Sequence, residues 1–223
     1  MDNAELLMNT ELFSGLTKEE IEETMGCFQF TKKQFNKGET IYHAGDVVHD
    51  IGLVISGNVN IESDDAWGNR SILENIGKGH VFAENYASLK EEPLLINVVA
   101  ADKTEILFIN ITKLLTPCCN HCAHHNKMIQ NLLSLAARKN LMLSRRIFHT
   151  TPKTIRGRLL SYLSTQATLH DSRYFTIPFD RQQLADYLGV DRSALSSELG
   201  KMKKDGLIDV HKNDFHLYSH ESS

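Results

Sequence analysis

The chain has 223 residues, of which 41% are hydrophobic and 23% charged, a composition typical of a globular protein with one or two domains. No apolar run reaches the roughly 18 residues of a membrane span, and the N-terminal stretch MDNAELLMNTELF lacks the basic segment of a signal peptide. Four cysteines do not form a disulfide framework in a chain of this length, so we expect a cytoplasmic protein without a membrane partner.

The charge is divided unevenly along the chain. Residues 1–125 contain 9 Lys and Arg against 19 Asp and Glu, whereas residues 126–223 contain 15 against 9, within a formal net charge of −4. A basic C-terminal part suggests a polyanionic partner. An uneven scatter of solvated charges would give the same totals.

The N-terminal part predicts a short helix followed by many strands. A helix is expected from Thr17, with Glu20 at the spacing of a capping box. From Phe28 to Ile111, short β-branched and aromatic runs alternate with turns at six glycines (Gly38, Gly45, Gly57, Gly68, Gly77 and Gly79). This spacing is typical of an all-β sandwich or barrel.

A long helix is predicted next. Thr116 and Pro117 have the features of an N-cap and a first helical residue, and the helical pattern continues to about His149. One face carries residues at alternating spacings of four and three, an a/d seam with an asparagine at an a position. This pattern favours a parallel two-stranded dimer, and the alternative is a helix that packs on its own domain. The seam consists of Ile129, Leu133, Ala136, Asn140, Leu143 and Ile147.

The start of this helix is rich in cysteine and histidine, in the stretch PCCNHCAHH. Cys118, His121, Cys122 and His125 fall on one helical face, and Cys119 and Cys122 form a C-x-x-C pair. Such residues can bind zinc or an iron–sulfur cluster, or sense redox state through a thiol. One straight helix separates i and i+7 by roughly 10 Å, so a closed site needs ligands from elsewhere. We therefore favour small, half-buried structural residues and expect no metal.

A second Thr-Pro pair, Thr151 and Pro152, predicts the start of a further helix with the sequence TPKTIRGRLLSYLSTQATL. The break before it divides the chain into three parts. We expect a β-domain over residues 1–116, a dimerisation helix over 117–149 and a C-terminal domain over 150–223.

The C-terminal domain contains the pattern of a helix-turn-helix. Asp180 and Gln183 have capping-box spacing, Gly189 suits a sharp turn, and Asp191 is placed to cap a second helix. The apolar residues of that second helix, Leu195, Leu199 and Met202, share one face. The stretch LIDVHKNDFHLYS then predicts a hairpin that turns at Lys212, Asn213 and Asp214, in the position of a wing.

The opposite face of the second helix suits the major groove of DNA. Its side chains are small and polar, so the backbone can approach the base pairs closely, and Arg192 can bind guanine in a bidentate manner. Lys201 and Lys204 suit phosphates. The small residues of this face are Ser193, Ser196, Ser197 and Gly200. A generic surface helix rich in serine is the alternative.

Taken together, these stretches resemble the Crp/Fnr family of cyclic-AMP receptor and fumarate–nitrate regulators. LFSGLTKEEIE resembles the N-terminal helix of the family, and FNKGETIYHAGDVVHDIGLVISGNVNI resembles its β-roll. The seam helix corresponds to the family's dimer helix and the last seventy residues to its winged helix. The resemblance implies an α+β fold: a double-stranded β-helix domain of the jelly-roll or cupin-like type, a dimerisation helix and a winged helix-turn-helix.

The resemblance also implies the DNA contacts. The family's base-contacting positions fall on Arg192, Ser193, Ser196 and Ser197, and its phosphate-contacting positions on Arg181 and Gln182. Members that read DNA through a glutamate and a second arginine have these where Ser193 and Ser197 stand here. We therefore expect a different operator, with Arg192 as the dominant specific contact.

The effector region departs from the family pattern. Glu84 matches the acid that binds ribose, but Ala83, which follows Phe82, replaces a glycine. Leu94 and Leu95 stand where arginine and serine hold the cyclic phosphate. A phosphate without a cation in a partly dry pocket is costly, so we do not expect cyclic AMP to bind. An uncharged effector, or none, is expected, and no cofactor.

Two other functions compete with DNA binding. A cupin-like enzyme would need an H-x-H metal motif, and none of the eleven histidines forms one; G-x-S-x-G, P-loop and dinucleotide motifs are also missing. A plain oligomerisation module is the second. We predict a non-enzymatic homodimer that binds a palindromic operator and, if it activates transcription, contacts RNA polymerase.

Overall fold

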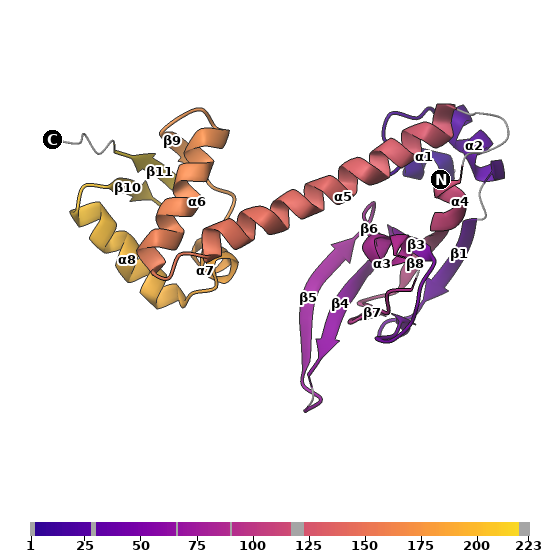
Figure 1. Cartoon of the computed structure of the whole chain (residues 1–223), viewed down its shortest axis with the longest axis horizontal. Coiled ribbons are helices and arrows are strands. Elements are labelled where there is room, and N and C mark those ends of the chain that lie inside the picture. Colours follow the sequence, from indigo (N-terminus) through magenta and orange to yellow (C-terminus); the bar gives the residue numbers. More distant parts are fainter. Residues whose placement is uncertain (1–2, 28–29, 66, 90, 117–122, 219–223) are drawn as a thin grey trace. The chain divides into compact units, whose positions relative to one another are not determined.

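The computed structural model describes residues 3–27, 30–65, 67–89, 91–116 and 123–218 (Figure 1). The chain forms two compact units, Met1–Arg138 and Lys139–Ser223, here called unit 1 and unit 2. None of the described helices is both long and apolar enough to cross a membrane.

Unit 1 is built from two four-stranded antiparallel sheets. The first sheet has the order β1-β8-β3-β6 and the second β2-β7-β4-β5. The strands are β1 (Phe30–Phe35), β2 (Thr40–Tyr42), β3 (Asp50–Ser56), β4 (Asn58–Asp64), β5 (Arg70–Gly77), β6 (Val81–Phe82), β7 (Asn97–Ala100) and β8 (Thr104–Asn110). The predicted all-β core, a β-roll, is confirmed.

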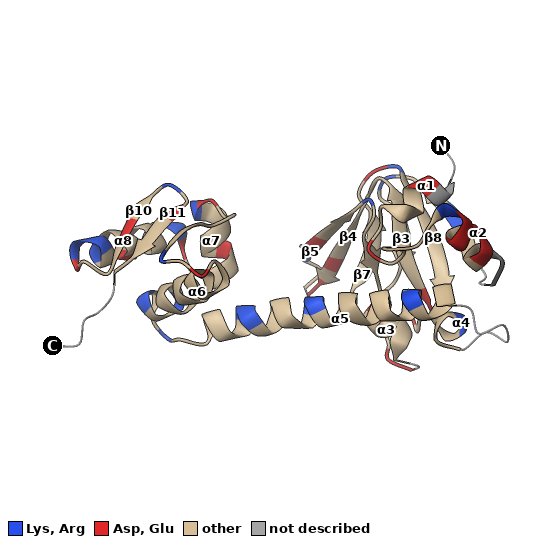
Figure 2. Ribbon diagram, turned by 90° about the horizontal axis from the view of Figure 1, so that it is seen from above, with Lys and Arg blue, Asp and Glu red and all other residues tan. Residues whose placement is uncertain are grey.

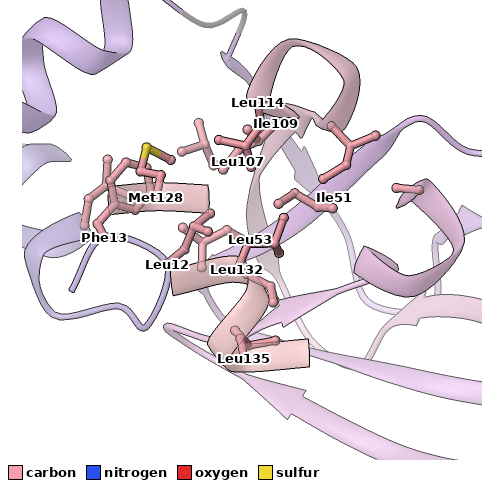
Figure 3. Close-up of a cluster of buried hydrophobic side chains, with 14 of the residues drawn as sticks. Leu12, Phe13, Ile51, Leu53, Leu107, Ile109, Leu114, Met128, Leu132 and Leu135 are labelled. Carbon is pink, nitrogen blue, oxygen red and sulfur yellow. The ribbon is translucent and has the colours of Figure 1, made fainter. Parts of the chain in front are cut away.

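The first sheet is buried on both faces, which explains the nearly unbroken apolar runs of its central strands, IGLVI in β3 and ILFI in β8. One face packs against the second sheet around Val54, Phe82 and Phe108. The other face packs against helices, as Figure 3 shows for Ile51, Leu53, Leu107 and Ile109.

The helices that cover this face of the first sheet come from several parts of unit 1. They are α1 (Asn3–Met8), α2 (Lys18–Cys27), α3 (Glu84–Ser88), α4 (Ile111–Leu115) and the start of α5 (Ala123–Thr150). Leu12 and Phe13 from the N-terminal segment and Met128, Leu132 and Leu135 from α5 enter the same cluster (Figure 3).

Local signals set the helix ends. At α2 the predicted capping box is confirmed: the Thr17 backbone N–H donates to the Glu20 carboxylate (2.8 Å), and the Glu20 N–H donates to the Thr17 hydroxyl (3.3 Å). The short helix α1 carries no comparable pattern and was not predicted.

Both threonines of the predicted Thr-Pro helix starts close the preceding helix, and the N-cap predicted at Thr151 was wrong. Thr116 is the C-cap of α4, since its N–H and hydroxyl both donate to the Thr112 carbonyl. The described part of α5 begins at Ala123, and residues 117–122 lie outside the described residues. Thr151 likewise closes α5 by donating to the Ile147 carbonyl, and the N-cap of the next helix is Thr154. In both cases the threonine hydroxyl donates to a carbonyl in the last turn of the preceding helix, and a Thr-Pro pair alone does not reveal this.

Gly57 shows why the tight turns of the β-roll need glycine. It joins β3 to β4 at φ 78°, and a Cβ there would lie 2.4 Å from an Asp102 side-chain oxygen. The Asp102 carboxylate accepts hydrogen bonds from the Asn58 N–H and the Thr104 hydroxyl, which hold the turn against the β7–β8 connection.

Unit 2 is a winged helix. It contains the end of α5, then α6 (Ile155–Leu169), β9 (Tyr174–Thr176), α7 (Arg181–Leu188), α8 (Arg192–Lys204), β10 (Ile208–His211) and β11 (Asp214–Leu217). The three strands form an antiparallel sheet in the order β10-β11-β9. Strand β9 was not predicted, because three residues give no detectable alternation. The core joins Leu159 and Leu163 of α6 to Leu184, Leu195 and Leu199.

Candidate nucleic-acid interface

Helices α7 and α8 form the predicted helix-turn-helix. The Asp180 carboxylate accepts the Gln183 N–H (2.8 Å), and the Gln183 side chain accepts the Asp180 N–H (2.9 Å), a complete capping box. Gly189 then adopts the left-handed conformation at φ 63°, and Asp191 caps α8 by accepting the N–H groups of Ser193 and Ala194. The turn is therefore fixed by local interactions.

Helix α8 has the two faces that its sequence predicts. Leu195, Leu199 and Met202 are buried on one side. Residues on the other side are exposed: Arg192, Ser193, Ser196, Ser197, Gly200, Lys201 and Lys204. A Cβ at Gly200 would meet nothing within 4 Å, so this surface is low and open. Figure 2 shows the basic residues gathered on α8.

Two of the predicted base-contacting or phosphate-contacting residues on α8 already have partners. The Ser193 hydroxyl donates to the Asp191 carboxylate. This bond, together with those from the N–H groups of Ala194 and Ser193, lowers the pKa of Asp191. Lys201 lies 3.5 Å from Glu198, a carboxylate that is also held at 2.6 Å by Arg156. A ligand at these positions would compete with the existing contacts, whereas the exposed Ser196 and Ser197 sit in the middle of the face.

Arg181 has a different setting from the exposed phosphate contact that the resemblance implies. Its guanidinium donates to the Lys212 carbonyl at the tip of the wing (2.7 Å) and lies 5.4 Å from the centre of the Phe215 ring. Burial lowers its pKa. Arg181 therefore joins α7 to the wing, while Gln182 beside it is exposed and donates to Asp186.

The wing is a two-residue hairpin. Strands β10 and β11 pair from Ile208 with Leu217 to His211 with Asp214, so the turn is Lys212 and Asn213. Asp214 is the first residue of β11, and the predicted three-residue turn is one residue too long. Lys212 has φ 52° and is exposed at the tip. The tip thus adds a cation near the start of α7.

Two arginines that the sequence did not single out hold the end of α7. Arg146 of α5 donates to the carbonyls of Asp186 and Tyr187 (both 3.3 Å), and Arg158 of α6 donates to those of Leu188 and Gly189 (2.9 and 3.0 Å). Cations suit the negative end of a helix, where carbonyls lack partners within the helix. They attach the helix-turn-helix to α5 and α6.

The candidate effector residues of the β-roll have unlike settings. Phe82 is buried against Gly52, where an added Cβ would lie 2.1 Å from the ring, and Leu94 is buried in the core below the helices. Leu95 points outward with 72% of its surface exposed. Ala83 keeps the left-handed conformation (φ 62°) and leads into α3, whose first residue, Glu84, is buried.

The predicted seam lies on the exposed side of α5. Leu133, Leu143 and Ile147 are 69, 60 and 65% exposed, Asn140 is exposed, and Ile129 and Ala136 are half-buried. The residues that pack on the β-roll are Met128, Leu132 and Leu135, each one position earlier than a seam residue. The two stripes are therefore about 100° apart on the helix.

Of the candidate ligands in this stretch, His125 belongs to the described residues, and Cys118, Cys119, His121 and Cys122 lie outside them. The His125 ring is buried and its Nε2 forms a hydrogen bond with the Leu114 carbonyl. Among the described residues, no group of three or more His, Cys, Asp or Glu side chains is arranged to hold a metal ion.

Two family models match the chain in its two units. A cyclic nucleotide-binding domain matches residues 32–118, and a Crp-like helix-turn-helix domain matches residues 157–219. Together they include both the β-roll and the helix-turn-helix described above.

Known proteins resemble the chain over different lengths. A cyclic AMP receptor protein of Thermus thermophilus is 30% identical over 101 residues, which cover 45% of this chain and 45% of that protein, so the match spans about half of the relative's length. The crystal structure of the catabolite activator protein of Thermus thermophilus has a TM-score of 0.51 at 23% identity, covering 94% of each chain. A structure of CprK complexed with OCPA has a TM-score of 0.57 at 16% identity, covering 90% of each chain. These structures support the fold.

Proposed function

The chain belongs to the Crp/Fnr family, and from this premise we propose that it is a homodimeric transcription regulator that binds a palindromic DNA operator through α8. The observation that carries the proposal is the exposed face of α8. Its small side chains admit close approach to a duplex, Arg192 stands at its start, and Lys204 near its end.

The exposed seam of α5 supports the homodimer. Burying an aliphatic side chain is worth roughly 1.5–3 kcal/mol, so a regular row of exposed Leu and Ile on one helix calls for a partner. A second copy supplies an identical seam, and Asn140 would favour the parallel, two-stranded register. Such a dimer is expected to read two half-sites one helical turn, about 34–36 Å, apart.

For the β-roll we propose an uncharged or apolar effector, or none. Leu94 belongs to the core and Leu95 faces outward, so neither provides a cation for a cyclic phosphate. Sensing by metal or thiol through residues Cys118 to His125 is the alternative signal. It rests on the sequence pattern alone, and metal analysis of anaerobically purified protein tests it. We propose no catalytic role, and a contact with RNA polymerase only if the protein activates transcription.

The test of the DNA-binding proposal is selection of duplexes from a random pool by the full chain. We expect an enriched palindrome, bound with an affinity that falls steeply with salt because phosphate contacts release counterions. Size measurement of the free protein should give a dimer. A monomer that ignores duplex DNA at low ionic strength would refute the proposal.

A further inference from the structure

A histidine is buried where α5 ends against the helix-turn-helix. His149, in the last turn of α5, is 1% exposed and lies within unit 2. Its Nδ1 is 2.9 Å from the hydroxyl of Tyr187 on α7, and its Nε2 is 3.1 Å from the hydroxyl of Thr165 on α6. One imidazole thus joins three helices.

The hydrogen bonds around His149 determine its tautomer. The Thr165 hydroxyl donates its only hydrogen to the Ser161 carbonyl (3.0 Å), so it must accept from His149. Nε2 therefore carries the proton, and Nδ1 accepts the hydrogen of the Tyr187 hydroxyl. The neutral imidazole satisfies both partners as they stand, whereas the imidazolium requires the Tyr187 hydroxyl to turn its hydrogen away from Nδ1.

The surroundings of the ring exclude water, which disfavours a positive charge on it. The ring of Tyr162 on α6 is perpendicular to the imidazole with 5.4 Å between the ring centres, and the rings of Tyr187 and Phe148 lie at 5.8 and 5.9 Å. The charged groups that α5 contributes are cations: Arg145, and Arg146, which lies 5.9 Å from the centre of the Tyr187 ring.

Helix α7 contributes one carboxylate near Tyr187, that of Asp186, and it accepts a hydrogen bond from Gln182. Burial, and after it the charge of Arg145, lower the pKa of His149. The hydrogen bonds and the neighbouring charges therefore both favour the neutral form of His149.

We propose that His149 is a proton-sensitive latch that fastens α7 to α5 while neutral and releases it when protonated. A proton on Nδ1 would meet the hydrogen of the Tyr187 hydroxyl, so that bond must break or reverse, and the new charge would lie among aromatic rings and guanidinium groups. The functional consequence rests on the proposed function, because release of α7 would displace α8 from its position on DNA.

The pH dependence of the latch follows from the linkage between proton binding and the two states. A histidine whose pKa is lower in the latched state than in the released state stabilises the latch fully at pH values above its pKa in the released state. This stabilisation is lost as the pH falls through its pKa in the latched state. A difference of one pKa unit between the two states changes their ratio by about tenfold at a pH below both. We therefore expect release in mildly acidic solution.

Hydrogen exchange on the full chain tests the latch without DNA. After correction for intrinsic exchange rates, peptides from α7 should lose protection between pH 7.5 and 5.5 in the wild type. Tyr187→Phe removes the donor to Nδ1 and keeps the ring, so the protection of α7 should already be reduced at pH 7.5 and should change less between the two pH values than in the wild type. His170→Gln, at an exposed histidine that ends α6, should behave as the wild type. If Tyr187→Phe reduced the protection of α7 by the same factor at pH 7.5 and at pH 5.5, so that the wild-type pH dependence remained, the hydroxyl would have a merely structural role and the proposal would be overturned.

A second readout uses the duplex selected by the protein. Its affinity should fall about tenfold or more between pH 7.5 and 5.5 at constant salt in the wild type and in His170→Gln, and the fall should be smaller in Tyr187→Phe, which has already lost the latch bond at pH 7.5. An affinity independent of pH, with unchanged protection of α7, would refute the latch. Failure to bind any duplex at either pH would refute the proposed function alone, because the exchange experiment stands without DNA.

Discussion

Among the basic residues predicted to contact DNA, Arg192 is exposed at the start of α8, where it could reach a base. It is exposed at the first position of α8, while Arg181 is folded onto the wing and Lys201 faces Glu198. A bidentate contact to guanine is worth roughly 1–3 kcal/mol of discrimination. We therefore propose that Arg192 is the dominant specific contact.

Arg192→Ala should weaken operator binding by about 1–3 kcal/mol and relax one position in each half-site. The measurement is the affinity for the selected duplex and for duplexes changed at single positions. Lys204→Ala is the control: it should weaken all duplexes alike and reduce the salt slope by about one. If Arg192→Ala also weakened all duplexes equally, Arg192 would be a phosphate contact.

Asp191 sets the start of α8. Its carboxylate accepts two backbone N–H groups and the Ser193 hydroxyl, and Asp191→Ala should reduce the free energy of unfolding by about 0.5–2 kcal/mol. Urea denaturation measures the change. Asp191→Asn keeps a capping oxygen and should retain most of the stability. Equal losses in both variants would show that the charge, and not the cap, matters.

On the scale of elements, α5 carries two apolar stripes, one buried and one exposed. The stripe of Met128, Leu132 and Leu135 is buried against the β-roll, so the alternative of a helix packed on its own domain is correct for that face. The seam one residue further along is exposed. A single helix can meet both needs because successive residues are about 100° apart.

A pair of substitutions separates the seam from the rest of α5. Leu141 and Leu143 are 56 and 60% exposed, but only Leu143 belongs to the seam. Leu143→Glu should dissociate the proposed dimer by burying like charges against each other, whereas Leu141→Glu should leave it intact. Sedimentation velocity over a range of concentrations measures the result. Dissociation by Leu141→Glu alone would place the interface on another face.

On the scale of the whole molecule, the family fold does not fix the ligand. The β-roll is present with a buried Glu84, yet Leu94 and Leu95 provide no group to pair with a phosphate. A fold can be kept while its binding site changes, because the core and the site depend on different residues.

Calorimetry with cyclic AMP and with cyclic GMP should therefore show no binding at micromolar concentrations. The physical reason is that a cyclic phosphate would lose its hydration without gaining a cation. The selected duplex, titrated under the same conditions, serves as the positive control. Micromolar affinity for either nucleotide would contradict the prediction.

The sequence by itself determined those parts of the fold that local interactions control. The capping boxes at Thr17 and Asp180, the turn at Gly189 and the buried face of α8 depend on residues within a few positions of one another, and each was confirmed. The alternation of strands and glycine turns predicted the β-roll for the same reason.

Only the tertiary structure decided which side chains meet across the chain. Arg181 with Lys212, Arg146 with Asp186 and His149 with Tyr187 are separated by 31, 40 and 38 residues, so no local period contains them. Their pairing depends on how α5, α6, α7 and the wing pack around one core. Periodicity states which face of a helix is apolar, whereas packing decides what covers that face.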